Sequence, residues 1–373
     1  MQPSSALPAR ITMLSGGVGG SRFAQGVRHL IRRSAEASDP TAPEAPGTDR
    51  TEVTDPAPAS VPDPAPATSR TAASDPASAT SITCIVNTGD DMWLNGLRVC
   101  PDLDSMMYGL AGVNDRDRGW GRAGETERVS AELIAYGVGA DWFTLGDLDL
   151  GTHIARTQLL RSGLGLTEVT RRLSARWDLG ATLLPATEHE VETRVRVDED
   201  RTLHFEEWWV RHRAALPARE FVHPGAAEAV PAPGALEAIR DADVILLAPS
   251  NPIVSVGAIL RIPGIADALR GASAPVIGLS PILGDAPVLG MAAQCLRAVG
   301  AEVSAAGVAR HYGARASGGM LDGWLVDEQD AEAVPGLEDA GIVAAAVPLL
   351  MGSDDLTADM AQAALDLAGR TGR

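Results

Sequence analysis

The sequence at residues 11–27 reads ITMLSGGVGGSRFAQGV, a short apolar run followed by a turn with four glycines and the start of an amphipathic segment. Residues 11–14 have the length and composition of a buried strand, and residues 22–33 place their large apolar side chains on one face of a helix. Residues 82–86 form a second apolar run. The order strand, glycine turn, helix and strand predicts a βαβ unit, which is the building block of a parallel sheet.

A segment of different composition, residues 39–80, separates this helix from the second strand. It contains nine prolines and only two large aliphatic side chains, Val53 and Val61. Such a segment buries too little apolar surface to offset the entropy of ordering its backbone. We predict a disordered insert, rich in Pro, Ala and Asp, within the crossover of the βαβ unit.

The C-terminal half shows the same alternation of strands and helices. Apolar runs occur at residues 244–247, 275–279 and 342–347, and a closing helix is expected at residues 356–367. Pro, Ser and Asn bound these runs, a pattern typical of buried parallel strands with functional turns at their carboxyl ends. We therefore predict an α/β fold in which residues 9–111 and 233–373 form a Rossmann-like core that binds nucleotide and substrate.

Residues 112–232 have a different pattern. They contain three helical segments, at residues 127–136, 152–161 and 167–177. Two segments of alternating polar and apolar residues, 191–197 and 202–208, then flank Asp198-Glu199-Asp200, which indicates a β-hairpin. We interpret this region as an inserted, mostly helical subdomain that carries the hairpin.

The composition excludes several chemistries. All 31 basic residues of the 373-residue chain are arginines, and no lysine is present. A Walker A phosphate loop, a pyridoxal Schiff base and a lysine general base each need a lysine amine, so none of them can operate here. Anions must be bound by arginine, by backbone N–H groups or by a metal ion.

Charge, cysteine content and hydropathy narrow the class of protein further. The formal net charge of −18 disfavours nucleic acid and anionic membranes as partners. The three cysteines lack the CxxC spacing of a zinc site and suggest no disulfide framework. The first ten residues lack a basic region followed by an apolar core, and the longest apolar stretches are too short to span a bilayer, so the sequence predicts a cytoplasmic protein.

The glycine turn is the first candidate binding site. Gly16, Gly17, Gly19 and Gly20 join a strand to a helix start, where free N–H groups and the helix dipole favour an anion such as phosphate. The spacing departs from the usual G-x-G-x-x-G pattern. A tight strand-to-helix turn with no ligand is therefore the alternative interpretation.

Two clusters of carboxylates form the second candidate site. Asn87, Asp90 and Asp91 follow the second strand, and Asp102 and Asp104 lie about a dozen residues further on. Carboxylates from two such turns can converge on one divalent cation, which in turn binds a diphosphate. In the alternative interpretation, Asp102 and Asp104 cap a helix that begins at Ser105.

Further residues lie in turns or between the two acidic clusters. Trp93 can stack on a flat ring or belong to the core. Ser250, Asn251 and Ser280 follow strands and are candidates for base, ribose or acceptor contacts, with ordinary turn chemistry as the alternative. In the segment LGDLDLGTH at residues 145–153, Asp149 can cap a helix and His153 is expected to be structural.

Taken together, these motifs resemble one family, the 2-phospho-L-lactate transferases of coenzyme F420 biosynthesis, also called CofD-like proteins. The matching segments run in order along the chain: LSGGVGGSRFAQGV, IVNTGDDMWLNGLRVCPDLDSMMY, WFTLGDLDLGTHIARTQLLRSG, LLAPSNPIVSVGAIL and VIGLSPILG. The segments GDDMW and VCPDLD are most similar to the actinobacterial branch, the phosphoenolpyruvate transferases.

The resemblance implies a Rossmann-like fold, a homodimer and Mg²⁺ as cofactor. It also implies transfer of a phosphorylated three-carbon acid from a guanosine diphosphate-linked donor to the ribityl hydroxyl of the deazaflavin FO, with release of GMP. In the actinobacterial branch the donor is enolpyruvoyl-2-diphospho-5′-guanosine and the product is dehydro coenzyme F420-0. With the lactyl donor the product is F420-0, and the sequence leaves enolpyruvate, lactate and glycerate open.

The resemblance also assigns roles to residues. It implies that Asp90 and Asp104 are catalytic and bind Mg²⁺, with Asp91 or Asp102 nearby, although Asp104 also matches an acid that contacts FO. Thr144 matches a position where some archaeal relatives have a lysine against the deazaflavin, and Arg98 or Arg156 can compensate for that loss. Gly16–Gly20 would then face the donor phosphates, with Asn87, Ser250, Asn251 and Ser280 contacting the nucleotide or the acceptor.

Two other functions fit parts of the sequence. A non-catalytic regulator that binds nucleotide sugars would share the glycine turn and the Asn87–Asp91 turn, but the second acidic cluster favours the transferase. A nicotinamide-dependent dehydrogenase has only the glycine turn in its favour.

Overall fold

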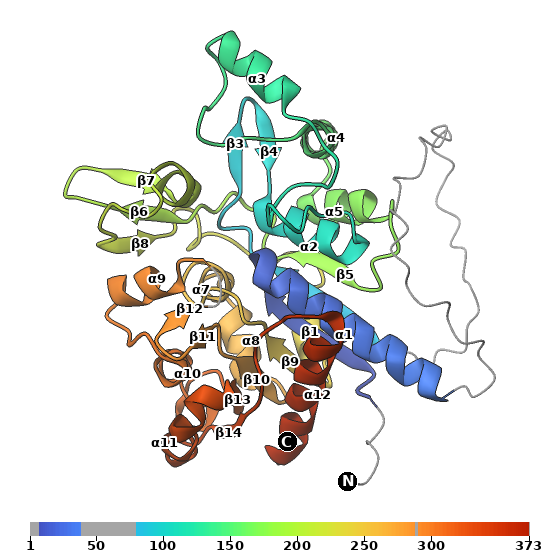
Figure 1. Cartoon of the computed structure of the whole chain (residues 1–373), viewed down its shortest axis with the longest axis vertical. Coiled ribbons are helices and arrows are strands. Elements are labelled where there is room, and N and C mark those ends of the chain that lie inside the picture. Colours follow the sequence, from blue (N-terminus) through green and yellow to red (C-terminus); the bar gives the residue numbers. More distant parts are fainter. Residues whose placement is uncertain (1–6, 39–79, 288–289, 373) are drawn as a thin grey trace.

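The computed structural model describes residues 7–38, 80–287 and 290–372 (Figure 1). The predicted insert at residues 39–80 lies outside the described residues, except for Thr80. The centre of the described part is a seven-stranded sheet with the order β14-β13-β10-β9-β1-β2-β5, in which all neighbours are parallel. Its strands are β1 (Arg10–Ser15), β2 (Ser81–Val86), β5 (Thr182–Pro185), β9 (Val244–Leu247), β10 (Val276–Leu279), β13 (Gly323–Val326) and β14 (Val343–Ala346). The predicted α/β fold with a parallel sheet is confirmed.

The strand order places a topological switch point between β1 and β9. From β1 the chain extends the sheet outward through β2 and β5, then returns to β9 and extends it on the other side. In open α/β sheets of this kind, ligands bind outside the carboxyl ends of the strands at the switch point. The glycine turn after β1 and the Ser250-Asn251-Pro252 turn after β9 both lie at this point.

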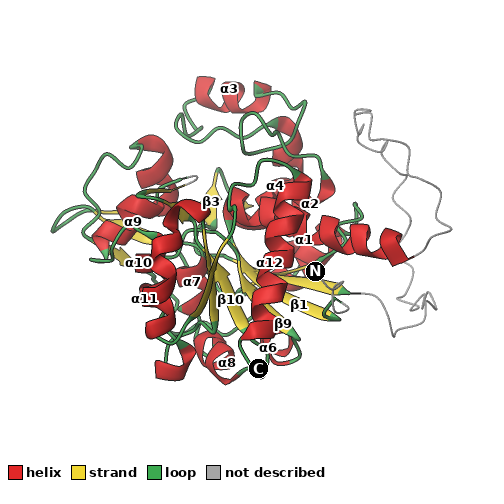
Figure 2. Ribbon diagram, turned by 60° about the horizontal axis from the view of Figure 1, so that its bottom comes forward, coloured by secondary structure: helices red, strands yellow, loops and turns green. Residues whose placement is uncertain are grey.

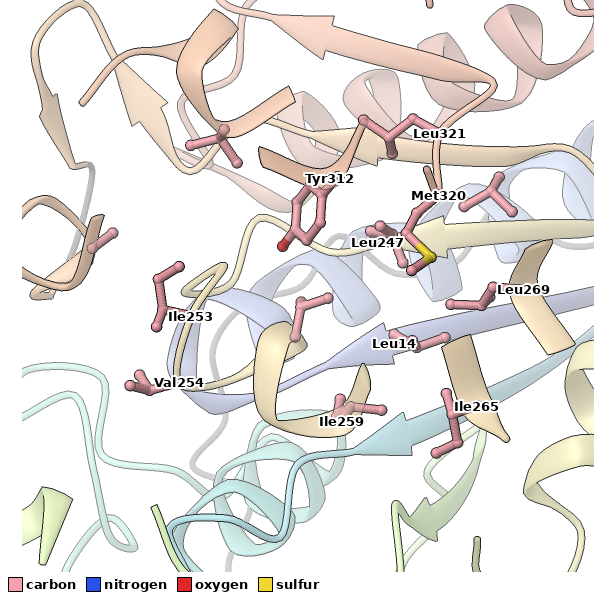
Figure 3. Packing of buried hydrophobic residues seen from close by; sticks show 14 of the residues in the cluster. Leu14, Leu247, Ile253, Val254, Ile259, Ile265, Leu269, Tyr312, Met320 and Leu321 are labelled. Carbon is pink, nitrogen blue, oxygen red and sulfur yellow. The ribbon is translucent and has the colours of Figure 1, made fainter. Parts of the chain in front are cut away.

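Helices bury both faces of the sheet (Figure 2). The helices α1 (Gly17–Ser38) and α12 (Asp354–Arg370) pack together over one face. The other face is covered by α6 (Ala235–Arg240), α7 (Val256–Leu260), α8 (Ile265–Gly271), α9 (Ala292–Ala298), α10 (Ala305–Tyr312) and α11 (Val334–Asp339). In β9, Val244 and Leu246 pack in the apolar cluster on the side of α1 and α12. Ile245 and Leu247 pack in the cluster on the opposite side, where Figure 3 shows Leu247. This alternation follows from the two-residue period of a strand whose two faces are both buried.

The part of the chain between β2 and β9 carries the remaining helices and two small sheets. They are the hairpin of β3 (Met92–Leu94) and β4 (Leu97–Val99), the helices α2 (Pro101–Ala111), α3 (Arg128–Ala135), α4 (Asp147–Arg161) and α5 (Leu166–Ser174), and the three-stranded sheet of β6 (Arg194–Arg196), β7 (Thr202–His204) and β8 (Glu220–Val222). The predicted helices at 127–136, 152–161 and 167–177 correspond to α3, α4 and α5.

Two predictions for this part need correction. The range 112–232 is not a separate subdomain throughout, because β5 lies within it and pairs with β2 at the edge of the main sheet. The predicted hairpin is present as β6 and β7, but the second strand ends at His204, and residues 207–211 form a short π-helix. Phe205 and Trp208 both enter the core, and this three-residue spacing suits a helical turn, not a strand.

The remaining short elements lie in the C-terminal half. They are the strand pair β11 (Ile282–Leu283) and β12 (Ala286–Pro287) and two short 3₁₀ turns at Arg315–Ser317 and Glu328–Ala333. None of the helices in the described ranges combines the length and hydropathy that a bilayer-spanning segment requires.

Candidate active site

The turn after β2 joins the two acidic motifs through Asn87. Its side-chain amide donates hydrogen bonds to Asp90 Oδ2 at 3.1 Å and to Asp102 Oδ2 at 2.9 Å, and its carbonyl oxygen accepts from the Gly89 N–H at 2.8 Å. Asn87 is buried and is hydrogen-bonded to one carboxylate of each cluster. One side chain thus brings Asp90 and Asp102 of the two motifs together.

The second acidic motif lies inside a helix and does not precede one. Helix α2 begins at Pro101, which suits the first helical position because its missing N–H would have no partner there. Asp102 and Asp104 lie in the first turn of α2, and the N-cap is Cys100, which makes no side-chain capping bond. The alternative of a helix that begins at Ser105 with a capping carboxylate is wrong.

Asp102 also contacts the glycine turn. The backbone N–H of Gly17 donates a hydrogen bond to its carboxylate, and the carboxylate leaves no room for a side chain at Gly16. Gly17 begins α1 with a φ of +64°, a conformation that favours glycine. A carboxylate of the protein thus lies at the helix start where the sequence predicts a phosphate.

The other two glycines of the turn allow close packing against the turn after β9. A Cβ at Gly19 would lie 3.0 Å from the carbonyl oxygen of Pro249, and one at Gly20 would collide with the hydroxyls of Ser15 and Ser250. The glycine turn therefore brings the ends of β1 and β9 and the start of α2 together.

The polar residues predicted at the other strand ends make their hydrogen bonds within the protein. Ser250 Oγ accepts from Gly16 N–H at 3.2 Å and donates to Gly16 O at 2.8 Å. Asn251 Oδ1 accepts from two backbone N–H groups of its own turn, at 3.0 and 3.3 Å, and its amide donates to Cys295 Sγ at 3.4 Å. Ser280 Oγ makes two hydrogen bonds to the backbone of Ile282. These contacts match the alternative of ordinary turn chemistry. They involve only groups of the protein.

Three carboxylates of the site lie close together without a cation, and we call Asp90, Asp102 and Glu206 the unpaired acid group. Burial, together with the charges of Asp102 and Glu206, raises the pKa of Asp90 well above its ordinary value. Burial raises the pKa of Asp102 to about 7, and burial and the charge of Asp102 raise the pKa of Glu206 to about 8. Across the described part of the chain, none of the three makes an ion pair. Because the described part of the chain gives these buried acids no counterion, their protonated forms are favoured.

Three other carboxylates each lie beside an arginine or a histidine, and we call Asp91, Asp104 and Asp149 the paired acid group. Asp91 lies 3.3 Å from Arg98, and Asp104 forms an ion pair with Arg156. Burial raises the pKa of Asp91 to about 6 against the opposing charge of Arg98.

Asp149 belongs to the same group through His153 and Tyr108. It lies 3.3 Å from His153 and accepts a 2.7 Å hydrogen bond from Tyr108. Although burial disfavours its charge, the neighbouring His153, Tyr108 and Arg156 lower the pKa of Asp149. Carboxylates of both acid groups are buried. The paired group therefore differs from the unpaired group in having arginine or histidine neighbours, not in its degree of burial.

Asp104, Asp149 and His153 are also close enough to one another to hold a metal ion, with ligand atoms within 4.8 Å. A cation is already present there, because the guanidinium of Arg156 contacts both Asp104 and His153. A divalent ion in the same place would be repelled by this guanidinium. The unpaired acid group is the better candidate for metal binding.

Several buried polar atoms of the site have no hydrogen-bond partner among the described residues. They are Asp90 Oδ1, Asp91 Oδ1, Arg98 Nη1, Asp104 Oδ2 and His153 Nε2. Most buried polar groups in native proteins are hydrogen-bonded, so such a concentration marks a place where an ion, a ligand or water completes the structure.

Trp93 and Thr144 lie at the periphery. Trp93 is 43% exposed, so the core interpretation is wrong for it; its indole N–H donates to Glu190 at 3.0 Å and its ring lies 5.9 Å from the Arg98 guanidinium. Thr144 is partly exposed in the irregular segment before α4. Sequence reasoning did not identify Glu206, because no motif surrounds this residue. It identified Arg98 and Arg156 only as residues that can compensate for the lysine of some archaeal relatives.

The fold and this site define a class, the Rossmann-like α/β proteins with an acidic site at the switch point of the sheet. The chain matches the family described as 2-phospho-L-lactate transferase CofD over residues 11–341. It is 46% identical over 365 residues to the phosphoenolpyruvate transferase of Mycolicibacterium smegmatis, covering 96% of this chain and 99% of that protein. It is 48% identical over 362 residues to the phosphoenolpyruvate transferase of Streptomyces coelicolor, covering 96% and 98%.

A solved structure supports the fold. The UPF0052 family protein BH3568 of Bacillus halodurans superimposes with a TM-score of 0.55 at 15% identity, covering 96% of this chain and 99% of that one. The chain therefore belongs to the CofD family of 2-phospho-L-lactate transferases. It is a transferase of coenzyme F420 biosynthesis, as the motifs predict.

Proposed function

We propose that this transferase moves a phosphoenolpyruvyl group from enolpyruvoyl-2-diphospho-5′-guanosine to the ribityl hydroxyl of FO, which gives dehydro coenzyme F420-0 and GMP. Relatives named phosphoenolpyruvate transferase align with the chain from end to end, which supports enolpyruvate over lactate as the acid. The observation that carries the proposal is the junction of Asn87, Asp90 and Asp102 with the glycine turn at the switch point.

The reaction needs positioning and charge neutralisation more than covalent chemistry. The hydroxyl oxygen of FO forms a bond to the phosphorus that carries the enolpyruvyl group, and the bond from that phosphorus to the bridging oxygen breaks. GMP leaves with the bridging oxygen, and the hydroxyl proton is released. Holding the hydroxyl and the phosphorus in line and neutralising the diphosphate provide most of the rate enhancement in such transfers.

Mg²⁺ fits the unpaired acid group. Within the described residues Asp90 Oδ1 is buried without a hydrogen-bond partner, and Asp102 and Glu206 add two further carboxyl groups beside it. Hard carboxylate oxygens are the ligands that Mg²⁺ prefers. When bound, Mg²⁺ supplies positive charge to the diphosphate and to the three carboxylates; Asp90 would hold it, with Asp102 held in place by Asn87 and Gly17.

Asp104 has two roles open to it from the sequence, Mg²⁺ ligand and contact of the FO hydroxyl. Its ion pair with Arg156 already supplies a cation, which favours the second role. In that role Asp104 Oδ2, which has no hydrogen-bond partner among the described residues, accepts the proton of the hydroxyl or orients it. Trp93 offers a partly exposed aromatic face to the deazaflavin ring, and no cation stands at Thr144.

The experiment that tests the donor acid compares three substrates. Purified protein is incubated with FO, Mg²⁺ and the enolpyruvyl, lactyl or glyceryl form of the guanosine diphosphate-linked donor, and the deazaflavin products are separated by chromatography. The expected result is the highest kcat/KM for the enolpyruvyl donor. A higher kcat/KM for the lactyl donor would make the chain a 2-phospho-L-lactate transferase in the strict sense.

We also propose, from the family resemblance, that the protein is a homodimer, which light scattering on the purified protein checks directly.

The rival function is a non-catalytic regulator that binds nucleotide sugars. It predicts binding of a guanosine nucleotide with no deazaflavin product, so the same incubation distinguishes the transferase from the regulator.

A further inference from the structure

Arg156 lies at the centre of the paired acid group. It is 2% exposed and projects from α4. One terminal nitrogen forms an ion pair with Asp104 Oδ1 of α2. The other donates to His153 Nδ1 at 3.0 Å and to the backbone oxygen of Arg98 in β4 at 3.3 Å. One guanidinium thus joins α2, α4 and the β3–β4 hairpin.

The contact with His153 defines the state of that ring. A guanidinium is always a donor, so His153 Nδ1 accepts and the ring proton lies on Nε2. Nε2 lies 3.3 Å from Asp149 Oδ1, and the same oxygen accepts from the hydroxyl of Tyr108 in α2. The His153 ring that contacts Arg156 therefore lies beside Asp149, and Asp149 is bound in turn by Tyr108 of α2.

This arrangement fixes one oxygen of Asp104 and leaves the other without a hydrogen bond. Oδ1 is bound by Arg156, whereas the buried Oδ2 lies 3.6 Å from His153 Nδ1 and has no hydrogen-bond partner in the described ranges. A carboxylate in the first turn of a helix can rotate about its side-chain bonds, and the ion pair removes that freedom.

We propose that Arg156 is a positioning residue that orients Asp104 so that its Oδ2 meets the acceptor hydroxyl. This inference rests on the proposed function, because it takes FO as the acceptor. Arg156 acts on the reaction through Asp104, because its guanidinium contacts Asp104, His153 and the backbone oxygen of Arg98.

The side chain has to be an arginine for this purpose. Its planar fork holds three acceptors on separate elements at once, whereas the ammonium of a lysine is a single point on a flexible stem. Arg156→Lys therefore keeps the charge beside Asp104 but loses the contacts that orient it. We expect it to restore only part of the activity that Arg156→Gln loses.

A double-mutant cycle tests the proposal. The rates of product formation with FO and the enolpyruvyl donor are measured for the wild type, Arg156→Gln, Asp104→Asn and the double variant. If Arg156 acts through Asp104, Arg156→Gln lowers kcat about thirtyfold alone and less than about threefold in the Asp104→Asn background, with the KM of the donor within about twofold.

Arg315→Lys is the matched control. Arg315 is 6% exposed and pairs with Asp322 in the C-terminal half, where it also donates to three backbone oxygens. Arg315→Lys should lower the melting temperature and leave kcat unchanged, which separates a loss of stability from a loss of positioning. If Arg156→Gln does not fold, Arg156→Lys replaces it in the same cycle.

Two results would overturn the proposal. One is an equal loss of kcat from the Arg156 variant in both backgrounds, which shows that it acts independently of Asp104. The other is a folded Arg156 variant with the kcat of the wild type. A wild-type protein that forms no deazaflavin product would instead refute the proposed function itself, and this inference with it.

Discussion

The unpaired and the paired acid groups have nearly the same sequence origin and opposite electrostatic surroundings. Asp90 and Asp91 are adjacent in one turn, and Asp102 and Asp104 share the first turn of α2. Yet Asp91 and Asp104 face arginines, whereas Asp90 and Asp102 face Asn87 and Glu206. Each motif contributes one carboxylate to each group.

The difference follows from which elements surround each carboxylate. Arg98 comes from β4 and Arg156 from α4, and Arg156 donates a hydrogen bond to the backbone oxygen of Arg98. Asp90 and Asp102 instead have a third acid, Glu206, as a neighbour, and it follows β7. We infer that the paired acids are neutralised by the protein itself, and that the unpaired acids await a metal ion.

The largest expected effect is a loss of activity when Asp90, the proposed metal ligand of the unpaired acid group, is replaced. Asp90→Asn should lower the rate of GMP release about 10³-fold, because the diphosphate then lacks its neutralising cation. Circular dichroism should show an unchanged fold, since Asp90 lies in a turn. A rate within tenfold of the wild type would show that Asp90 is not needed to hold the metal.

The next effect is a loss of stability in the paired group. Arg156→Gln leaves Asp104 buried without its counterion, which should lower the free energy of unfolding by about 3–5 kcal/mol. Denaturant unfolding monitored by tryptophan fluorescence measures it. A change below about 1 kcal/mol would mean that water or another side chain replaces the guanidinium.

Metal binding should stabilise the protein through the unpaired group alone. Mg²⁺ at about one hundred times its dissociation constant is expected to add about 2.7 kcal/mol to the stability of the wild type. Asp90→Asn should show no such gain, whereas Arg98→Lys, which changes the paired group, should retain it. Melting curves with Mg²⁺ and with a chelator provide the comparison; an equal gain in Asp90→Asn would place the metal elsewhere.

The smallest expected effect is a change in the free energy of unfolding that has opposite signs in the two acid groups. Without metal, Asp90→Asn should raise the stability by about 1 kcal/mol, because it removes repulsion from Asp102 and Glu206. Asp104→Asn should lower it, because a charge-assisted bond to Arg156 is lost. Paired melting curves in chelator check both; a decrease in both variants would mean that the two groups do not differ as described.

The features that short-range patterns encode could be predicted from the sequence. The run at residues 11–14 and the turn at Gly16–Gly20 became β1 and the start of α1, because strand length and glycine spacing are local properties. The approach of Asp90 to Asp102 was predictable because two acidic turns about a dozen residues apart can converge on one point.

The features that depend on distant parts of the chain could not be predicted. Glu206 joins the site from a segment more than a hundred residues beyond Asp102, and no local pattern distinguishes it from the adjacent Glu207. Strand β5 is only four residues long and is defined by its pairing with β2. The division of the acids into two groups depends on Arg98 and Arg156, whose partners are set by the packing of α4 against β4.

The most direct test of the account is GMP release in the presence and absence of metal. The purified protein is incubated with FO and enolpyruvoyl-2-diphospho-5′-guanosine, with Mg²⁺ or with a chelator, and GMP is quantified by chromatography for the wild type and for Asp90→Asn. The account predicts GMP together with a new deazaflavin product only for the wild type with Mg²⁺. GMP release by the wild type in chelator, or no GMP above the chelator control when Mg²⁺ is present, would contradict it.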